Sequence, residues 1–132
     1  LDKSRAAFLA EKLQLGLPVI PLVSHSSVIT AVSNDSDSRL IFAQQVMALG
    51  STGDALLAIS TSGNSENIIC ALITAKAKGM RTIGLSGNTG GNMKNFCDVM
   101  ITVPATSTPE IQELHLPVYH SICSIIEHAL FK

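Results

Sequence analysis

Hydroxyl side chains gather in one short stretch, residues 60–65 with the sequence STSGNS. An apolar run, residues 56–59, precedes this stretch, and a helical pattern follows it. A strand, a loop of small residues and a helix, in that order, present unpaired backbone N–H groups and the positive end of a helix dipole to an anion. The stretch holds no lysine, so it is not a nucleotide-type P-loop. It predicts a site that holds one phosphate monoester without transferring it. The alternative is a simple capped turn, with Ser62 or Asn64 as the N-cap.

Polar residues also interrupt the apolar helix predicted over residues 110–131. Gln112, His115 and Tyr119 share one face of that helix, whereas His120 is turned about 80° from Gln112 and lies roughly 12 Å further along a straight helix. A histidine titrates near neutral pH and can move a proton between adjacent carbons of a sugar. Gln112 and His120 can therefore serve one site only if Pro117 bends the helix, or if neighbouring subunits contribute one each.

Other polar residues have a simpler interpretation beside a functional one. For His25, His115 and His128 a hydrogen-bonded structural role is the simpler interpretation. Asp35 is either a turn-forming residue or a hydrogen-bonding partner of substrate hydroxyls.

Composition excludes several classes of protein. The 132 residues suffice for one domain, and hydrophobic residues make up 46% against only 14% charged, so we expect buried subunit interfaces and a homo-oligomer. A net charge of −1 argues against a nucleic-acid partner, and no apolar run is long enough to span a membrane.

Cys70, Cys97 and Cys123 are widely spaced without a CxxC pair, which is typical of reduced thiols in a cytoplasmic protein. Because the chain begins with Leu rather than Met, we expect that it lacks its native N-terminus.

Strands and helices are expected to alternate along the chain. The predicted helices cover residues 2–16 (ended by Gly16), 28–33, 38–49, 65–78 (ended by Gly79), 92–96 and 110–131 (with Thr108 as N-cap), and the predicted strands cover 18–23, 54–59, 81–86 and 98–103. Such alternation requires a parallel sheet with helices on both faces. Ligands of such sheets bind at the carboxyl ends of strands, which places residues 24–27, 34–35, 60–65 and 86–91 at one rim. Several hydroxyl-rich loops at one rim favour a sugar phosphate.

Three segments carry a resemblance to a known family. They read LLAISTSGNSENIICALITAKAKGM, then IGLSGNTGG, then IQELHLPVYHSICSIIEHALF. From about residue 17 onward the chain resembles the sugar isomerase (SIS) family, and STSGNS marks that wider superfamily. The pattern IQE-x-H-x₄-H narrows the resemblance to the phosphoheptose isomerases.

The resemblance implies a fold and an activity. The fold would be an α/β three-layer sandwich with a central parallel sheet of flavodoxin-like type. Residues 1–132 would form a single SIS domain, the C-terminal two-thirds of the family fold. The activity would be interconversion of sedoheptulose 7-phosphate and D-glycero-D-manno-heptose 7-phosphate, which feeds lipopolysaccharide heptose synthesis. Relatives are cytoplasmic homotetramers with zinc in active sites between subunits.

The resemblance also implies roles for individual residues. It assigns phosphate binding to the serine-rich loop, substrate contacts to an Asn-Asp pair, and contacts with both substrate and zinc to a glutamine. A histidine would ligate zinc and transfer the proton. In this chain the serine-rich loop contains Ser60, Thr61, Ser62 and Ser65, and the Asn-Asp pair is Asn34 and Asp35. The glutamine is Gln112, and the histidine is His120.

Departures from the family pattern leave other functions open. An upstream GNGGS loop and an H-x₃-E motif, which carries a zinc ligand and the catalytic base, are absent from these residues, and Glu110 and Pro117 are unexpected. A similar SIS branch is a non-catalytic tetrameric scaffold that binds the bacterial replication initiator, and the C-terminal ALF resembles that branch. His120 favours the enzyme over the scaffold. A SIS regulator, or an isomerase of another sugar phosphate, is a third possibility.

Overall fold

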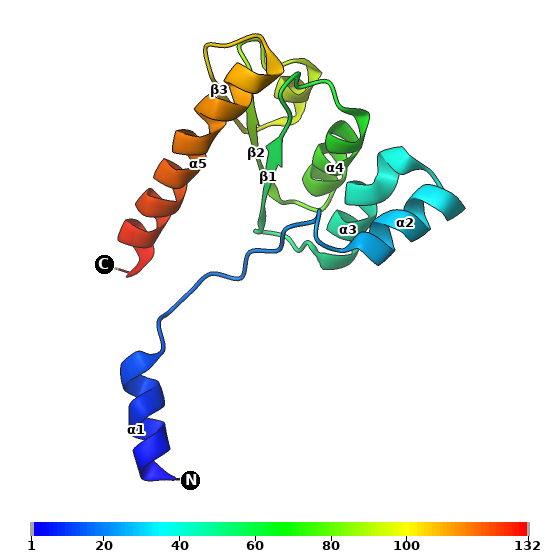
Figure 1. Cartoon of the computed structure of the whole chain (residues 1–132). Helices are drawn as coiled ribbons and strands as arrows, with labels where there is room; N and C mark the ends of the chain where they lie inside the picture. Colours follow the sequence, from blue (N-terminus) through cyan, green and yellow to red (C-terminus); the bar gives the residue numbers. More distant parts are fainter. Residues whose placement is uncertain (1, 132) are drawn as a thin grey trace.

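The computed structural model describes residues 2–131, and its centre is a parallel sheet (Figure 1). The strands β1 (Ala55–Ile59), β2 (Arg81–Ser86) and β3 (Val99–Thr102) lie in the order β1-β2-β3. Leu57 lies opposite Ile83, and Leu85 lies opposite Ile101. Each parallel connection has to cross over the sheet, which explains why a helix follows β1 and a helical turn follows β2.

Helices cover both faces of the sheet, as the sequence predicts. The helices of residues 2–131 are α1 (Lys3–Lys12), α2 (Ser26–Asp35), the 3-10 helix η1 (Ser38–Leu40), α3 (Ile41–Leu49), α4 (Glu66–Ala77), the 3-10 helix η2 (Asn92–Phe96) and α5 (Thr108–Phe131), of which α1 lies away from the sheet (Figure 1). Ala58 of β1 packs on Ile69 and Leu72 of α4, and α3 packs outside α4. The opposite side of the sheet belongs to α5 (Figure 1). The three-layer α/β fold is therefore confirmed. None of the described helices combines the length and apolar character needed to cross a membrane.

The N-terminal predictions are wrong in two places. The first helix ends at Lys12 rather than at Gly16, and no residue of α1 is buried, so packing does not extend it. The strand predicted over residues 18–23 does not form, because no described strand lies beside it and Pro18 and Pro21 lack the N–H groups that a ladder needs. Residues 13–21 instead run as an extended segment, which we call the arm (Figure 1).

Two helix ends also differ from the prediction. Asn34 and Asp35 lie in the last turn of α2 and not in a loop, because the helix continues through Asp35. At the start of α5 the cap lies one residue earlier than predicted. The carbonyl of Ser107 accepts a hydrogen bond from the N–H of Ile111 at 3.0 Å, and its hydroxyl donates to Glu110 at 2.6 Å. Ser107, not Thr108, therefore closes the N-terminus of α5.

Asp98 ties β3 to its neighbours on β2 and α4. Its Oδ2 accepts from the backbone N–H of Thr82 at 2.8 Å and its Oδ1 accepts from Lys76 Nζ at 3.0 Å. The Thr82 N–H, followed by Lys76 and the Thr82 hydroxyl, lowers the pKa of Asp98 to about 2. The ionised carboxylate is thus the form that the fold favours.

Asp98→Asn should lower stability at neutral pH and lose that effect in acid. The pKa of Asp98 is lower in the folded than in the unfolded protein, so its contribution is complete above about pH 4 and disappears as the pH falls towards about 2. Urea unfolding midpoints of the variant and the parent should therefore converge between pH 4 and pH 2. The exposed Glu113→Gln serves as a control with no expected difference. A gap for Asp98→Asn that stays constant over this range contradicts the prediction.

Candidate functional site

The stretch of residues 60–65, which we call the serine loop, joins β1 to α4. Ser60 is 7% exposed, and its Oγ lies 3.1 Å from the Oγ of Ser65 and accepts from the N–H of Gly63 at 3.2 Å. Gly63 has a φ of +67°, a conformation that side chains disfavour. Ser60 therefore shapes the loop from inside, whereas Ser62 and Ser65 are exposed to solvent.

The simple capped turn is not what the structure contains. Ser65 is the N-cap residue of α4, but no side chain caps the helix. Ser62 Oγ accepts from the N–H of Asn64, and Asn64 Oδ1 accepts from the N–H of Asn92 at 2.9 Å, so both predicted caps are engaged elsewhere. Within residues 2–131 no protein group accepts a hydrogen bond from the backbone N–H of Glu66 or of Asn67. These free donors lie where a helix dipole attracts an anion.

A second loop, residues 87–91, packs against the serine loop through the backbone. The N–H of Gly87 donates to the carbonyl of Thr61 at 3.0 Å, and the N–H of Met93 donates to the carbonyl of Gly63 at 2.9 Å. A Cβ on Gly63 would lie 2.2 Å from the carbonyl oxygen of Gly90, and a Cβ on Gly91 would lie 2.4 Å from that of Ser62. The shape of the serine loop thus depends on glycine on both sides.

The first turn of α5 lies at the same rim. A Cβ on Gly87 would lie 2.5 Å from Cδ1 of Ile111 and 2.9 Å from the carbonyl oxygen of Thr61. Gln112, the next residue, is exposed. His120 is also exposed, about two turns or roughly 12 Å further along the helix, with its ring edge-on to Tyr119 at 5.1 Å. One chain therefore brings Gln112, but not His120, to the rim.

Two cations near the rim were missed by the sequence interpretation. Arg39 lies on η1, which packs against α4. Its ion pair with Asp37 raises the pKa of Arg39, with smaller contributions from Cys70 and Glu66 at the start of α4. In return, the Arg39 guanidinium lowers the pKa of Asp37 to about 2. Lys94 packs beside Gly90 in the second loop. No motif separates these two residues from ordinary surface charges, since only the tertiary fold brings them to the loops.

Asn34 and Asp35 lie in the segment that leads to Arg39. Both are exposed at the end of α2, and the described side chains offer neither of them a hydrogen bond. They are therefore free to contact a ligand. Their part in substrate binding stays a prediction.

The residues present in one chain do not fit a zinc site. Residues 2–131 hold no group of three His, Cys, Asp or Glu side chains placed for a metal ion. Gln112 and His120 lie roughly 12 Å apart along one continuous helix, α5, and the described residues place no third ligand beside them, so one chain does not complete a zinc site.

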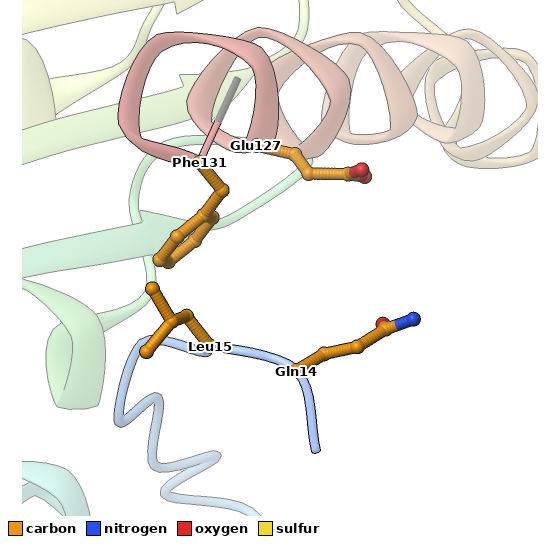
Figure 2. A pocket seen from close by; sticks show the side chains of 4 residues that line it. All are labelled: Gln14, Leu15, Glu127 and Phe131. Atoms are coloured by element: carbon orange, nitrogen blue, oxygen red, sulfur yellow. The ribbon is translucent and has the colours of Figure 1, made fainter. Parts of the chain in front are cut away.

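Two other features are separate from the rim. His115 is only 4% exposed, as expected for a structural residue. Its Nε2 has no hydrogen-bond partner among the described residues, so the hydrogen bond expected for a structural histidine is absent at that atom. An open cavity of about 510 Å³ lies between the arm and the end of α5, lined by Gln14, Leu15, Glu127 and Phe131 (Figure 2). This cavity takes no residue from the serine loop.

The fold and the serine loop define a class of protein. Residues 3–87 match the family model described as SIS domain, which is more than half of the chain. The chain belongs to the SIS domain family.

Within that family the chain is similar to phosphoheptose isomerases. It is 47% identical over 116 residues to the phosphoheptose isomerase of Burkholderia pseudomallei strain 1710b, covering 88% of this chain and 59% of that protein. It is 46% identical over 130 residues to that of Maridesulfovibrio salexigens, covering 96% and 63%. A solved phosphoheptose isomerase from Francisella tularensis superposes with a TM-score of 0.84 at 41% identity, covering 87% and 62%. The chain thus spans about 60% of the length of these relatives.

Proposed function

We propose that this chain is a phosphoheptose isomerase, which interconverts sedoheptulose 7-phosphate and D-glycero-D-manno-heptose 7-phosphate in lipopolysaccharide heptose synthesis. The observation that carries the proposal is the pair of unpaired N–H groups of Glu66 and Asn67, beside the exposed hydroxyls of Ser62 and Ser65. These donors suit a phosphate monoester. The names of the relatives favour this reaction over the scaffold alternative.

In the proposed reaction the serine loop holds the phosphate and so fixes the position of the open-chain sugar. Lys94 adds positive charge beside the second loop. A proton leaves C1 of the ketose while its C2 carbonyl oxygen gains one, which gives an enediol. The C1 hydroxyl then loses its proton to form the aldehyde, and C2 gains a proton, so no atom is lost or added. His120 moves a proton at these carbons.

His120 reaches the substrate from a second copy of the chain in this proposal. The distance of roughly 12 Å between Gln112 and His120 on one helix supports that arrangement. A homo-oligomer is also supported by the large apolar side chains that stay exposed on α5, such as Ile125 and Leu130, at 67% and 59%. We propose a tetramer, as the family resemblance implies. The further zinc ligands that the resemblance implies would come from a second copy or from upstream residues.

We also propose a cytoplasmic location. Cys70, Cys97 and Cys123 are all free thiols, as expected in a reducing compartment.

Ser65→Ala should weaken binding of the sugar phosphate with little effect on the chemical step. A hydrogen bond to a charged group contributes about 1.5–3 kcal/mol, so Kd and KM for sedoheptulose 7-phosphate should rise roughly 10- to 100-fold while kcat changes little. Calorimetry gives Kd even where turnover is slow. Ser51→Ala, at the opposite end of β1, is the matched control.

An unchanged Kd for Ser65→Ala would contradict the assignment of phosphate binding to the serine loop. Tight binding without turnover in the parent, together with capture of the replication initiator by both the parent and His120→Ala, would instead favour the scaffold.

A further inference from the structure

Two backbone N–H groups at the start of α4 lack a partner, although suitable side chains lie next to them in the sequence. An asparagine side chain commonly accepts from the N–H two residues further on, which makes Asn64 the local partner of Glu66. A serine at the N-cap accepts from the second or third N–H of its helix, which makes Ser65 the local partner of Asn67. Neither bond forms within residues 2–131, because both side chains are held by other groups.

Asn64 is held by the first residue of η2. Its Oδ1 accepts from the backbone N–H of Asn92 at 2.9 Å, and its Nδ2 donates to the carbonyl of Ser62 at 3.1 Å. The side-chain amide is thus fixed at both its oxygen and its nitrogen. Its oxygen is directed at Asn92 and not at the N–H of Glu66.

Ser65 is held by a residue from inside the loop. Its Oγ lies 3.1 Å from the Oγ of Ser60, which is 7% exposed. The third N–H of the helix already has partners, because Ile68 donates to the carbonyl of Ser65 at 3.0 Å and to Oδ1 of Asn67 at 2.9 Å. The N–H groups that stay open are therefore those of Glu66 and Asn67, the two whose local partners are engaged elsewhere.

This arrangement costs the empty protein a helix cap. Capping side chains stabilise helices, and the sequence supplies them at positions 64 and 65. The tertiary bonds withhold both, which leaves two adjacent donors at the positive end of the twelve-residue helix α4. An anion that binds there satisfies donors that the protein itself leaves open.

We propose that Asn64 is a positioning residue of the phosphate site, which acts through the backbone N–H of Asn92 to keep the start of α4 uncapped. This inference rests on the proposed function, because it explains why the donors of the serine loop are available to a phosphate. Asn64 itself does not contact the ligand. When its bond to Asn92 is broken, its side chain turns to the N–H of Glu66 and competes with the phosphate.

The first test breaks the same hydrogen bond from its two ends. Asn64→Ala removes the acceptor, so the loop loses a restraint and Kd for inorganic phosphate should rise about three- to tenfold, the usual effect of one neutral hydrogen bond. Asn92→Pro removes the donor, and proline fits the first position of a helix. Asn92→Pro also releases the Asn64 side chain to cap α4, so its Kd should rise further, by roughly 10- to 100-fold.

The double variant distinguishes competition by Asn64 from simple damage to the loop. Once Asn64→Ala has removed the side chain, nothing competes for the N–H of Glu66. Asn64→Ala/Asn92→Pro should therefore bind phosphate more tightly than Asn92→Pro alone, with a Kd close to that of Asn64→Ala. Simple damage predicts the reverse, because a second defect weakens binding further. A double variant that binds no more tightly than Asn92→Pro overturns the proposal.

NMR titration of the full chain with inorganic phosphate gives each Kd, and circular dichroism checks that each variant folds. Asn95→Ala, exposed on the same 3-10 helix, is the matched control and should keep the Kd of the parent. For sedoheptulose 7-phosphate, Asn64→Ala should raise KM and leave kcat nearly unchanged, because it alters binding alone. If Asn92→Pro does not fold, Asn64→Ala decides by itself, and an unchanged Kd overturns the proposal.

Failure of this inference is distinct from failure of the proposed function. If Ser65→Ala weakens phosphate binding and Asn64→Ala does not, the phosphate site is supported and the positioning role of Asn64 is wrong. A parent chain that binds no phosphate overturns both.

Discussion

Gly63→Ala should lower the free energy of unfolding by about 2–5 kcal/mol and abolish phosphate binding. The left-handed backbone of Gly63, with φ of +67°, costs about 1–2 kcal/mol for an L-residue. The added methyl group would also lie 2.2 Å from the carbonyl oxygen and 2.6 Å from the carbonyl carbon of Gly90. Such overpacking costs about 1–3 kcal/mol. Both atoms are backbone, so no flexible side chain can move aside.

Two other glycines distinguish the cost of the left-handed backbone from the cost of the clash with Gly90. Gly53 has a φ of +93° with nothing within 4 Å of its added Cβ, so Gly53→Ala should show the backbone cost alone. Gly16 has open space and no unusual φ, so Gly16→Ala should be close to neutral. Urea unfolding gives the three free energies, and NMR titration with inorganic phosphate gives the binding. A Gly63→Ala chain no less stable than Gly53→Ala would show that the two loops are not locked together.

His120→Ala should reduce kcat for sedoheptulose 7-phosphate by about 10²- to 10⁴-fold, the usual contribution of general acid–base catalysis, with little change in KM. The serine loop holds the phosphate independently of His120, which lies about two turns beyond the rim on α5. His128→Ala, on the same helix and likewise exposed, is the matched control. Equal activities of the two variants would show that His120 has no part in catalysis and would favour the scaffold alternative.

Mixing variants tests whether the site lies between two copies. Chains carrying only His120→Ala and chains carrying only Ser65→Ala are combined and allowed to exchange subunits, and turnover is measured at low substrate concentration. If one site takes its serine loop and its His120 from different copies, some mixed sites contain neither substitution and part of the turnover returns. If both come from one chain, every site keeps one defect and the mixture gains nothing.

Local sequence determines the centre of this fold. The run at residues 56–59, the small-residue loop and the helix that Gly79 ends form β1, the serine loop and α4 much as predicted, with Gly79 at a φ of +73°. Residues 81–86 form β2 with the predicted bounds. Each of these signals lies within a few residues of the structure it specifies, so neighbours in the chain are enough to read it.

Tertiary contacts decide the rest. Whether Asn64 caps α4 or pairs with Asn92 depends on a loop 28 residues away, and that choice leaves the donors of Glu66 and Asn67 free. Residues 18–23 have the composition of a strand but form none, because a strand needs a partner and residues 2–131 place none beside them. The sequence by itself determined β1, the serine loop, α4 and β2, and it predicts a phosphate ligand for that loop. Only the tertiary structure placed Gln112 at the rim, His120 beyond it and the arm outside the domain, because those positions depend on packing between segments far apart in the chain.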